Sequence, residues 1–204
     1  MSRRRAADEA LADRPTDNYP TPTWVTNQFI TEVLRKEYPE VSGPFLDPCA
    51  GEGHLISVIE LFGYRTAAVD IQPGHEESLK SITEGVVIAN FLQMDPRDVP
   101  FARSVITNPP FTFNQEFIEE CVRGPHLFDF VAFLMRLPML SSVKRYEWWH
   151  QDDLAPEHIY VLSARPKFLG GGNDMSDYAW FVWRPNESSS WPCKISILPP
   201  GGTR

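Results

Sequence analysis

The segment SVITNPPFTFN, residues 104–114, changes character in its middle. Its first four residues are β-branched or small and predict a buried strand. Asn108, two prolines and Phe111 follow, and a proline cannot continue a central strand because it has no N–H group to donate. The strand is therefore predicted to stop at this Asn-Pro-Pro-Phe segment, which carries an amide and an aromatic ring out of the sheet.

Short apolar runs alternate with segments of helical periodicity on both sides of this segment. Strands are predicted at 44–49, 65–71, 85–91, 104–109, 129–138, 158–164 and 178–185, and helices at 25–38, 53–63, 75–82, 114–124 and 141–154. This alternation is typical of an α/β fold with a mostly parallel sheet and helices on both faces. The last two strands are joined without a helix, so they are predicted to be antiparallel, since a parallel crossover normally needs one.

The bulk composition indicates one globular domain. The chain has 204 residues, of which 42% are hydrophobic and 23% are charged. Residues 1–17 are polar and are predicted to be a disordered tail. The globular domain is predicted at residues 18–185. Residues 186–204 are rich in Pro and Ser and are predicted to be an irregular tail. No apolar run reaches the ~20 residues that span a bilayer, and no apolar stretch follows the first charges as in a secretory signal.

The cysteines, histidines and charges limit the function classes. The three cysteines lie far apart, which fits a reduced cytoplasmic setting, and the five histidines lack metal-ligand spacing, so no metal site is expected. The net charge of −8 argues against a protein that binds a polyanion without a partner, because Lys and Arg side chains dominate such binding. A local basic patch can still exist, with Arg3, Arg4, Arg5, Lys144 and Arg145 as candidates.

A second informative segment is FLDPCAGEGHL, residues 45–55. Asp47 closes a predicted strand, and Gly51 and Gly53 precede a predicted helix. Glycine lets a ligand approach the backbone closely, and the start of a helix offers free N–H groups. Asp70 ends the next strand, where a carboxylate can accept hydrogen bonds from ribose hydroxyls. Together these residues indicate a pocket for a nucleoside cofactor.

The same segment argues against a dinucleotide. The G-x-G-x-x-G pattern of dinucleotide-binding proteins lacks its third glycine here, where Ile56 stands instead. Asp47 would also bring negative charge close to a pyrophosphate. A cofactor with a cationic end, such as S-adenosylmethionine, suits this carboxylate better.

The Asn-Pro-Pro-Phe segment indicates chemistry at a planar amine. The amino group of a base is a poor nucleophile because its lone pair is delocalised into the ring. Two acceptors that take both amino hydrogens, the Asn108 side-chain oxygen and the Pro109 carbonyl, would free that lone pair. Pro109 and Pro110 fix the backbone and remove competing donors, and Phe111 could stack on the base. Catalysis would then rest on positioning and on placed dipoles.

These motifs together resemble the class I S-adenosylmethionine-dependent methyltransferases, specifically the amino-methyltransferases that act on adenine N6 in DNA. The resemblance covers about residues 19–184 and rests on DPCAGEG at 47–53, on Asp70 and on NPPF at 108–111. It implies a Rossmann-like sheet of seven strands with an antiparallel final hairpin, a catalytic domain at 18–185, S-adenosyl-L-methionine as cofactor and a bacterial or phage source.

The resemblance also implies site residues. Its cofactor contacts are Tyr19, Pro20, Thr21, Asp47, Cys49, Ala50, Gly51, Glu52, Gly53, Asp70, Ile71, Asn90, Phe91 and Asn108. The catalytic residues are Asn108, Pro109, Pro110 and Phe111, and the residues expected at the target are Phe111, Thr112, Asn114 and Gly171. The family usually has an acid before the phenylalanine where this chain has Asn90, whose oxygen can still bond an adenine amino group.

Several functions stay open at the level of sequence. The chain has no room for a separate target-recognition domain, so a partner subunit could supply target recognition. Besides adenine N6 in DNA, the motif fits an RNA base at adenine N6 or guanine N2, and a protein glutamine through a related NPPY motif. An inactive accessory subunit is a further alternative, and an NAD-dependent oxidoreductase is disfavoured by the missing third glycine.

Overall fold

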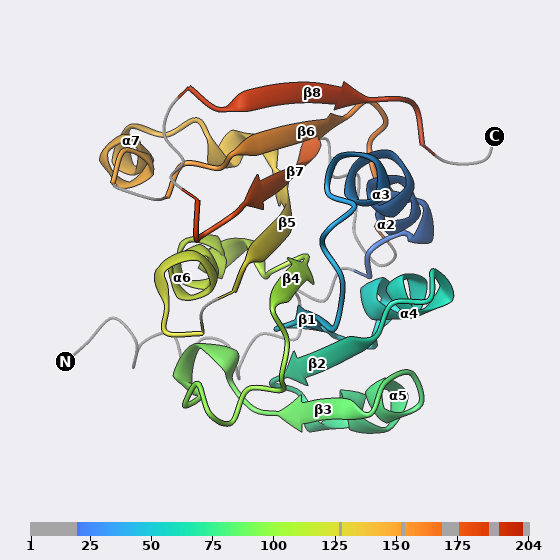
Figure 1. Ribbon diagram of the computed structural model, residues 1–204. Coiled ribbons are helices and arrows are strands. Elements are labelled where there is room, and N and C mark those ends of the chain that lie inside the picture. The colour runs from blue at the N-terminus through green and yellow to red at the C-terminus, as the bar shows by residue number, and fades with distance from the viewer. Residues whose placement is uncertain (1–19, 127, 152–153, 169–175, 188–191, 202–204) are drawn as a thin grey trace.

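The computed structural model describes residues 20–126, 128–151, 154–168, 176–187 and 192–201. Within them, eight strands form one sheet in the order β3-β2-β1-β4-β5-β7-β6-β8 (Figure 1). The strands are β1 (Phe45–Asp47), β2 (Thr66–Asp70), β3 (Gly85–Ile88), β4 (Ser104–Thr107), β5 (Phe130–Arg136), β6 (His158–Leu162), β7 (Tyr178–Trp183) and β8 (Lys194–Leu198). The predicted disordered tail at 1–17 lies outside the described residues.

The pairing of the strands confirms the predicted mixed sheet. Strands β3, β2, β1, β4 and β5 are parallel neighbours, and β7 runs antiparallel to both β5 and β6. The chain leaves β1 toward β2 and β3 and then returns to the other side of β1 as β4. Open α/β sheets bind ligands where the strand order reverses in this way, at the carboxyl ends of the strands.

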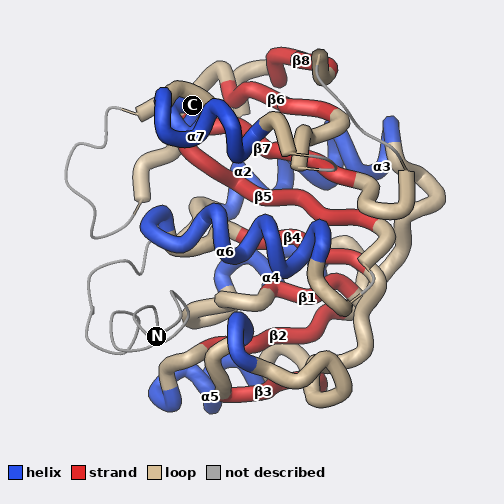
Figure 2. The backbone as a smooth tube through the Cα atoms, turned by 90° about the vertical axis from the view of Figure 1, so that its left-hand side faces the viewer, coloured by secondary structure: helices blue, strands red, loops and turns tan. Residues whose placement is uncertain are grey.

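Helices cover both faces of the sheet. One face carries a continuous helical segment, α2 (Thr23–Gln28), the π-helical η1 (Phe29–Leu34) and α3 (Arg35–Glu37), together with α4 (His54–Leu61) and α5 (Glu76–Lys80). The other carries α6 (Asn114–Ile118) with its π-helical continuation η5 (Glu119–Arg123), and α7 (Val143–Trp149). Figure 2 shows α6 and α7 in front of the sheet. The short 3-10 turns are η2 (Pro73–His75), η3 (Phe91–Gln93), η4 (Phe111–Phe113) and η6 (Leu137–Met139).

Strand β5 explains why the core has two halves. Its side chains alternate between the faces, as the period of two in a strand requires. Phe130, Ala132 and Leu134 pack with α2, η1 and α4, whereas the residues between them pack with α6 and α7. A strand that is apolar on both faces is expected in the middle of a sheet that is covered on both sides. Among the residues described, every helix is too short or too polar to traverse a lipid bilayer.

Strand β8 corrects the sequence analysis, which predicted seven strands and an irregular tail from residue 186. Residues 194–198 pair in parallel with β6 and form the eighth strand. The segment KISIL is short and lies between prolines, so its pattern alone is weak. Tertiary contacts decide its structure, because Leu198 is buried in the core and the Ser196 hydroxyl lies 2.8 Å from Nε2 of His158.

Two neighbouring substitutions test the placement of β8. Leu198→Ala should lower the free energy of unfolding by about 2–3 kcal/mol, because Leu198 is 5% exposed. Ile197→Ala should cost less than about 1 kcal/mol, because that side chain is 75% exposed. Urea-induced unfolding measures both values. Equal losses for the two variants would contradict the register described for β8.

Candidate active site

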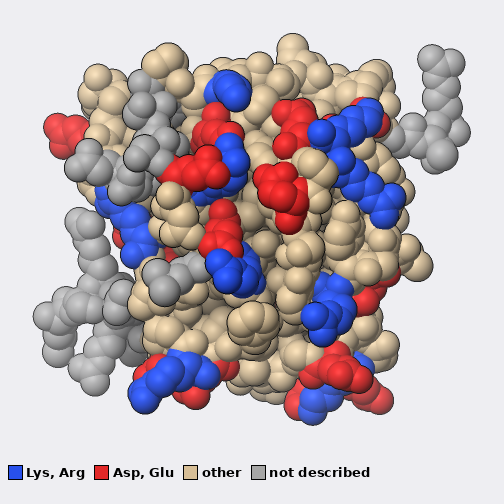
Figure 3. Space-filling view, viewed as in Figure 1, with Lys and Arg blue, Asp and Glu red and all other residues tan. Residues whose placement is uncertain are grey.

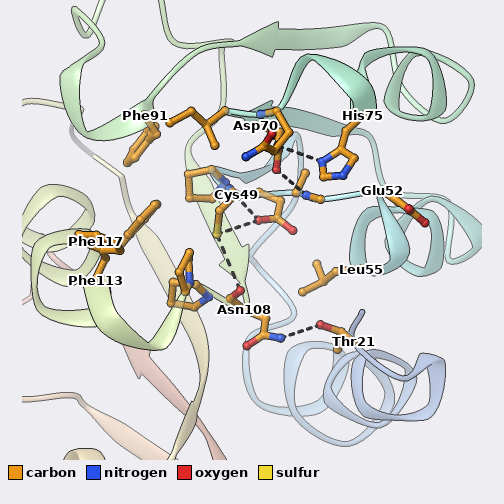
Figure 4. Close-up of a pocket in the computed structure, with 18 of the residues that line it drawn as sticks. Thr21, Cys49, Glu52, Leu55, Asp70, His75, Phe91, Asn108, Phe113 and Phe117 are labelled. Carbon is orange, nitrogen blue, oxygen red and sulfur yellow. Dashed lines mark hydrogen bonds and ion pairs between the residues drawn. The ribbon is translucent and has the colours of Figure 1, made fainter. Parts of the chain in front are cut away.

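A cavity of about 390 Å³ opens at the carboxyl ends of β1, β2 and β4. Its walls come from the glycine turn after β1, the segment after β2, the segment after β3 and the Asn-Pro-Pro-Phe segment after β4 (Figure 4). Four segments that are far apart in sequence thus meet at the place where the strand order reverses. The volume lies in the range of small-molecule and cofactor pockets.

Most residues predicted for the site line this cavity. They are Pro20, Thr21, Asp47, Cys49, Ala50, Gly51, Glu52, Asp70, Ile71, Asn90, Phe91, Asn108, Pro109, Pro110, Phe111 and Thr112. Gly53 and Asn114 are not among the lining residues: Gly53 precedes α4 in the left-handed conformation with φ of 88°, and Asn114 is buried at the start of α6. Tyr19 and Gly171 lie outside the described residues.

The Asp47 carboxylate joins the ends of two strands. Its Oδ1 accepts a hydrogen bond from the Thr107 hydroxyl at 2.7 Å and from the Cys49 backbone N–H at 3.2 Å. The Cys49 thiol in turn lies 3.0 Å from the Thr107 hydroxyl oxygen. These contacts connect the glycine turn after β1 to the last residue of β4. Thr107 has no place among the predicted residues, because a threonine that closes a strand carries no signal of its own.

Burial controls the protonation of the Asp47 carboxyl group. It raises the pKa of the Asp47 carboxyl from 3.8 to about 7, although the hydrogen bonds from Thr107 and Cys49 lower the pKa in part. Burial also raises the pKa of the Cys49 thiol well above its ordinary value. Cys49 is therefore a neutral thiol and not a nucleophile.

The Asp70 carboxylate is the second buried acid of the cavity. Its Oδ2 accepts a hydrogen bond from the Gly51 N–H at 2.7 Å, and its Oδ1 accepts one from the Gln72 N–H at 2.8 Å. Nδ1 of His75 lies 3.0 Å from the same Oδ1. Asp70 thus fixes the glycine turn to the end of β2. Gln72 and His75 line the cavity, and no motif in the sequence pointed to them.

The Asn108 amide has a defined orientation. Its Nδ2 donates a hydrogen bond to the Thr21 hydroxyl at 3.1 Å. Figure 4 shows the amide oxygen on the side away from Thr21. Thr21 precedes α2, so the segment ahead of this helix determines which way the amide of the Asn-Pro-Pro-Phe segment points. Sequence analysis had assigned Thr21 to the cofactor alone.

The segment after β3 forms another wall of the cavity. The Asn90 side-chain oxygen accepts a hydrogen bond from the Leu92 N–H at 3.2 Å and so caps the following turn. The Phe91 ring is buried and stacks on the rings of Phe117 and His126, with centroid distances of 5.9 and 5.1 Å. The predicted strand here ends three residues early, at Ile88. The wall is therefore an aromatic surface beside a capped turn.

The Phe111 ring lines the cavity as well. Its centroid is 6.1 Å from that of Tyr178, and the Arg136 guanidinium lies over it at 3.9 Å.

No group of three or more His, Cys, Asp or Glu that could hold a metal ion occurs in the described ranges.

No protein-family model and no curated protein matches this sequence. Solved structures do share its fold. A protein from Listeria monocytogenes assigned to the class I S-adenosylmethionine-dependent methyltransferases has a TM-score of 0.60 and 16% identity, with 96% of this chain matched to 72% of that one. A protein from Pyrococcus horikoshii assigned as an RNA methyltransferase has a TM-score of 0.60 and 14% identity, over 90% of this chain and 98% of that one.

A third structure is the M protein of the type I restriction enzyme EcoKI. It has a TM-score of 0.63 and 16% identity, over 91% of this chain and 49% of that one. At such identities the likeness concerns the fold. The chain has the fold of the class I S-adenosylmethionine-dependent methyltransferases, as the sequence motifs indicated.

The raised pKa of Asp47 predicts how the stability of the protein changes with pH. The folded state binds the Asp47 proton more tightly than the unfolded state, so this group makes the protein less stable as pH rises from about 4 to about 7. Between pH 5 and pH 8 the loss should be on the order of 2 kcal/mol.

Asp47→Asn serves as the matched variant, because asparagine keeps an acceptor oxygen and does not titrate. Urea-induced unfolding at both pH values should show a smaller loss in Asp47→Asn than in the unaltered protein. An identical pH dependence of the two proteins would mean that Asp47 titrates in its ordinary range.

Proposed function

We propose that this protein transfers the methyl group of S-adenosyl-L-methionine to the exocyclic amino group of a nucleic-acid base, with adenine N6 in DNA as the first candidate. The observation that carries the proposal is the Asn108 amide, which Thr21 orients beside a cavity bounded by two buried carboxylates. A positioned amide oxygen at the carboxyl end of β4 is what methylation of a planar amine requires.

The chemistry of the cavity fits this cofactor. Asp47 would face the positively charged methionine end, and Asp70 would accept hydrogen bonds from the ribose hydroxyls. Each carboxylate oxygen has two lone pairs, so Oδ2 of Asp70 can accept a hydroxyl besides the Gly51 N–H. Phe91 would lie against the adenine. When bound, the cofactor supplies an electrophilic methyl group.

The residues of the chain would then act on the target amine. The Asn108 oxygen and the Pro109 carbonyl accept its two hydrogens, which directs the nitrogen lone pair toward the methyl group. Phe111 supports the plane of the base. No strong base is needed, because the electrophile is cationic and the amine proton can leave to water after transfer. These residues would contribute by positioning the target amine and by presenting preorganised hydrogen-bond acceptors to it.

The comparisons support a nucleic acid as target and do not separate DNA from RNA. The EcoKI M protein belongs to a restriction enzyme, whereas the Pyrococcus horikoshii protein is assigned as an RNA methyltransferase. RNA is the second candidate. The match covers 98% of the Pyrococcus horikoshii protein, so the likeness extends over nearly the whole of a protein that is assigned as an RNA methyltransferase. A partner subunit that supplies target recognition is part of the DNA proposal.

A transfer assay tests the function directly. The protein is incubated with methyl-labelled cofactor and, separately, with duplex DNA, single-stranded DNA, RNA and a protein extract. Digestion of the product should yield labelled N6-methyladenine from DNA. Label in RNA alone would move the proposal to its second candidate, and label in protein glutamine would reject a nucleic-acid target.

Asn108→Ala should lower the rate of transfer by a factor on the order of 10²–10³, because it removes one acceptor of the target amine. Cofactor affinity, measured by titration calorimetry, should stay within a few-fold of the unaltered value. Asn27→Ala is the matched control, since Asn27 is exposed on α2 and should leave the rate unchanged. A joint loss of affinity and rate in Asn108→Ala would give Asn108 a role in cofactor binding.

Asp70→Asn should weaken cofactor binding about 10- to 100-fold, because it replaces a charged acceptor of the ribose hydroxyls by a neutral one. Asp98→Asn, at an exposed aspartate, provides the control. Equal affinities of Asp70→Asn and the unaltered protein in calorimetry would refute the ribose assignment.

A further inference from the structure

Strand β8 forms one edge of the sheet. It pairs in parallel with β6 on its inner side, and among the described residues no strand pairs with its outer side. The Lys194 N–H donates to the Glu157 carbonyl at 3.1 Å, so the backbone groups of Lys194 point toward β6. Because these groups alternate along a parallel pair, Ile195 and Ile197 direct their N–H and C=O groups outward, away from β6. The outer side of β8 is therefore open to another strand.

The apolar face of the sheet continues onto β8, beyond its helical cover. Ile195 is in register with Ile159 of β6, which is in register with Phe181 of β7, so the three side chains share one face. Phe181 and Ile159 are buried, and Trp149 of α7 stacks on Phe181 with a centroid distance of 6.3 Å. Ile195 is 65% exposed and Ile197 is 75% exposed. Figure 2 shows α7 in front of β6 and β7, with β8 beyond it. Two isoleucines thus extend the buried rows into solvent.

This edge carries little charge that would keep another strand away. Lys194 is the only charged residue of the KISIL segment. In Figure 3 the upper rim of the molecule, where β8 lies in Figure 1, is mostly uncharged, whereas Lys and Arg side chains lie next to Asp and Glu over the rest of this face. Natural proteins commonly protect an edge strand with charges, bulges or a covering segment. An apolar edge with so little protection is suited to strand addition.

We propose that β8 is a homodimer interface, in which it pairs in the antiparallel direction with β8 of a second copy of the chain, centred on Ser196. Ile195 of each copy then lies opposite Ile197 of the other. The outward backbone groups of both isoleucines find partners in this register, because such a pair exchanges both of its N–H···O bonds. The isoleucines of the two copies form one apolar patch. Lys194 lies opposite Leu198, so like charges do not face each other.

The sequence of β8 favours a second copy of the chain as the occupant. In KISIL one isoleucine stands on each side of the central serine, so the strand is complementary to itself about a two-fold axis, as a symmetric dimer requires. A shift of the register by one residue would turn the isoleucines of the two copies to opposite faces. The alternative occupant within the same chain is the segment 1–19, which is rich in charge and lacks the alternating apolar pattern of a strand.

This interface goes beyond the proposed function and does not depend on it. The cavity opens at the carboxyl ends of β1, β2 and β4, and three further strands, β5, β7 and β6, separate them from β8. Pairing at β8 therefore leaves the cavity of each copy accessible.

Sedimentation velocity over a range of protein concentrations tests the interface. The unaltered chain should show a monomer–dimer equilibrium with a Kd on the order of micromolar, because strands of five residues make a small interface. Ile197→Lys should raise this Kd at least about tenfold, since it places a charge in the apolar patch. Leu61→Lys is the matched control, because Leu61 is 84% exposed on α4 and should leave the dimer unchanged. A chain that stays monomeric at every concentration overturns the inference, and so does a dimer that Ile197→Lys leaves intact.

A cysteine at the centre of the register gives a second measurement. Ser196 of the two copies would form a pair without backbone bonds between them, with Cα atoms about 4.5 Å apart, a distance that suits a disulfide. Ser196→Cys should therefore give a covalent dimer on mild oxidation, seen on a non-reducing gel, and adding Ile197→Lys should abolish it. Ser81→Cys is the control, because Ser81 is exposed after α5, next to β3 at the opposite edge of the sheet. Equal cross-linking of the two cysteine variants overturns the inference.

The methyl-transfer assay separates the interface from the proposed function. Ile197→Lys should transfer methyl groups at the rate of the unaltered protein, because β8 lies away from the cavity. A dimer that depends on Ile197, in a protein that transfers no methyl group, would support the interface and reject the function. Methyl transfer by a protein that is monomeric at every concentration would support the function and reject the interface.

Discussion

The Asp47 carboxylate holds together the two segments on which the site depends. It is buried between β1 and β4 and accepts hydrogen bonds from the Thr107 hydroxyl and the Cys49 N–H. Burial of a carboxylate is costly unless such partners satisfy it. The same bonds that satisfy Asp47 therefore fix the glycine turn relative to the Asn-Pro-Pro-Phe segment. In the proposed function, this local constraint would help to set the distance between the methyl donor and the target amine.

The charges of the protein bear on both its proposed cofactor and its proposed target. The net charge of −8 describes the whole chain, whereas binding depends on the local potential. The buried acids Asp47 and Asp70 line the cavity, whereas Arg136 lies over the Phe111 ring and is not among the lining residues. The acidic lining suits the proposed cationic cofactor, and the net charge does not by itself exclude an anionic target.

Particular residues show how far the sequence analysis reached. The glycine turn, Asp70 and the Asn-Pro-Pro-Phe segment were predicted to meet, because the carboxyl ends of parallel strands share one edge, and all three line the cavity. Thr107, His75 and Arg136 were missed, since each acts through a contact with a residue from another strand or loop. Strand β8 was missed because its five residues depend on pairing with β6.

By itself, the sequence determined the alternation of strands and helices, the order in which they follow and the polar residues that end the strands. These features are local, and they depend on the spacing of apolar residues and on glycine and proline at the strand ends. Only the tertiary structure decided the orientation of the Asn108 amide, the burial of Asp47 and the position of Arg136 on Phe111. Each of these depends on side chains that meet from distant segments, and no pattern along the chain encodes such a meeting.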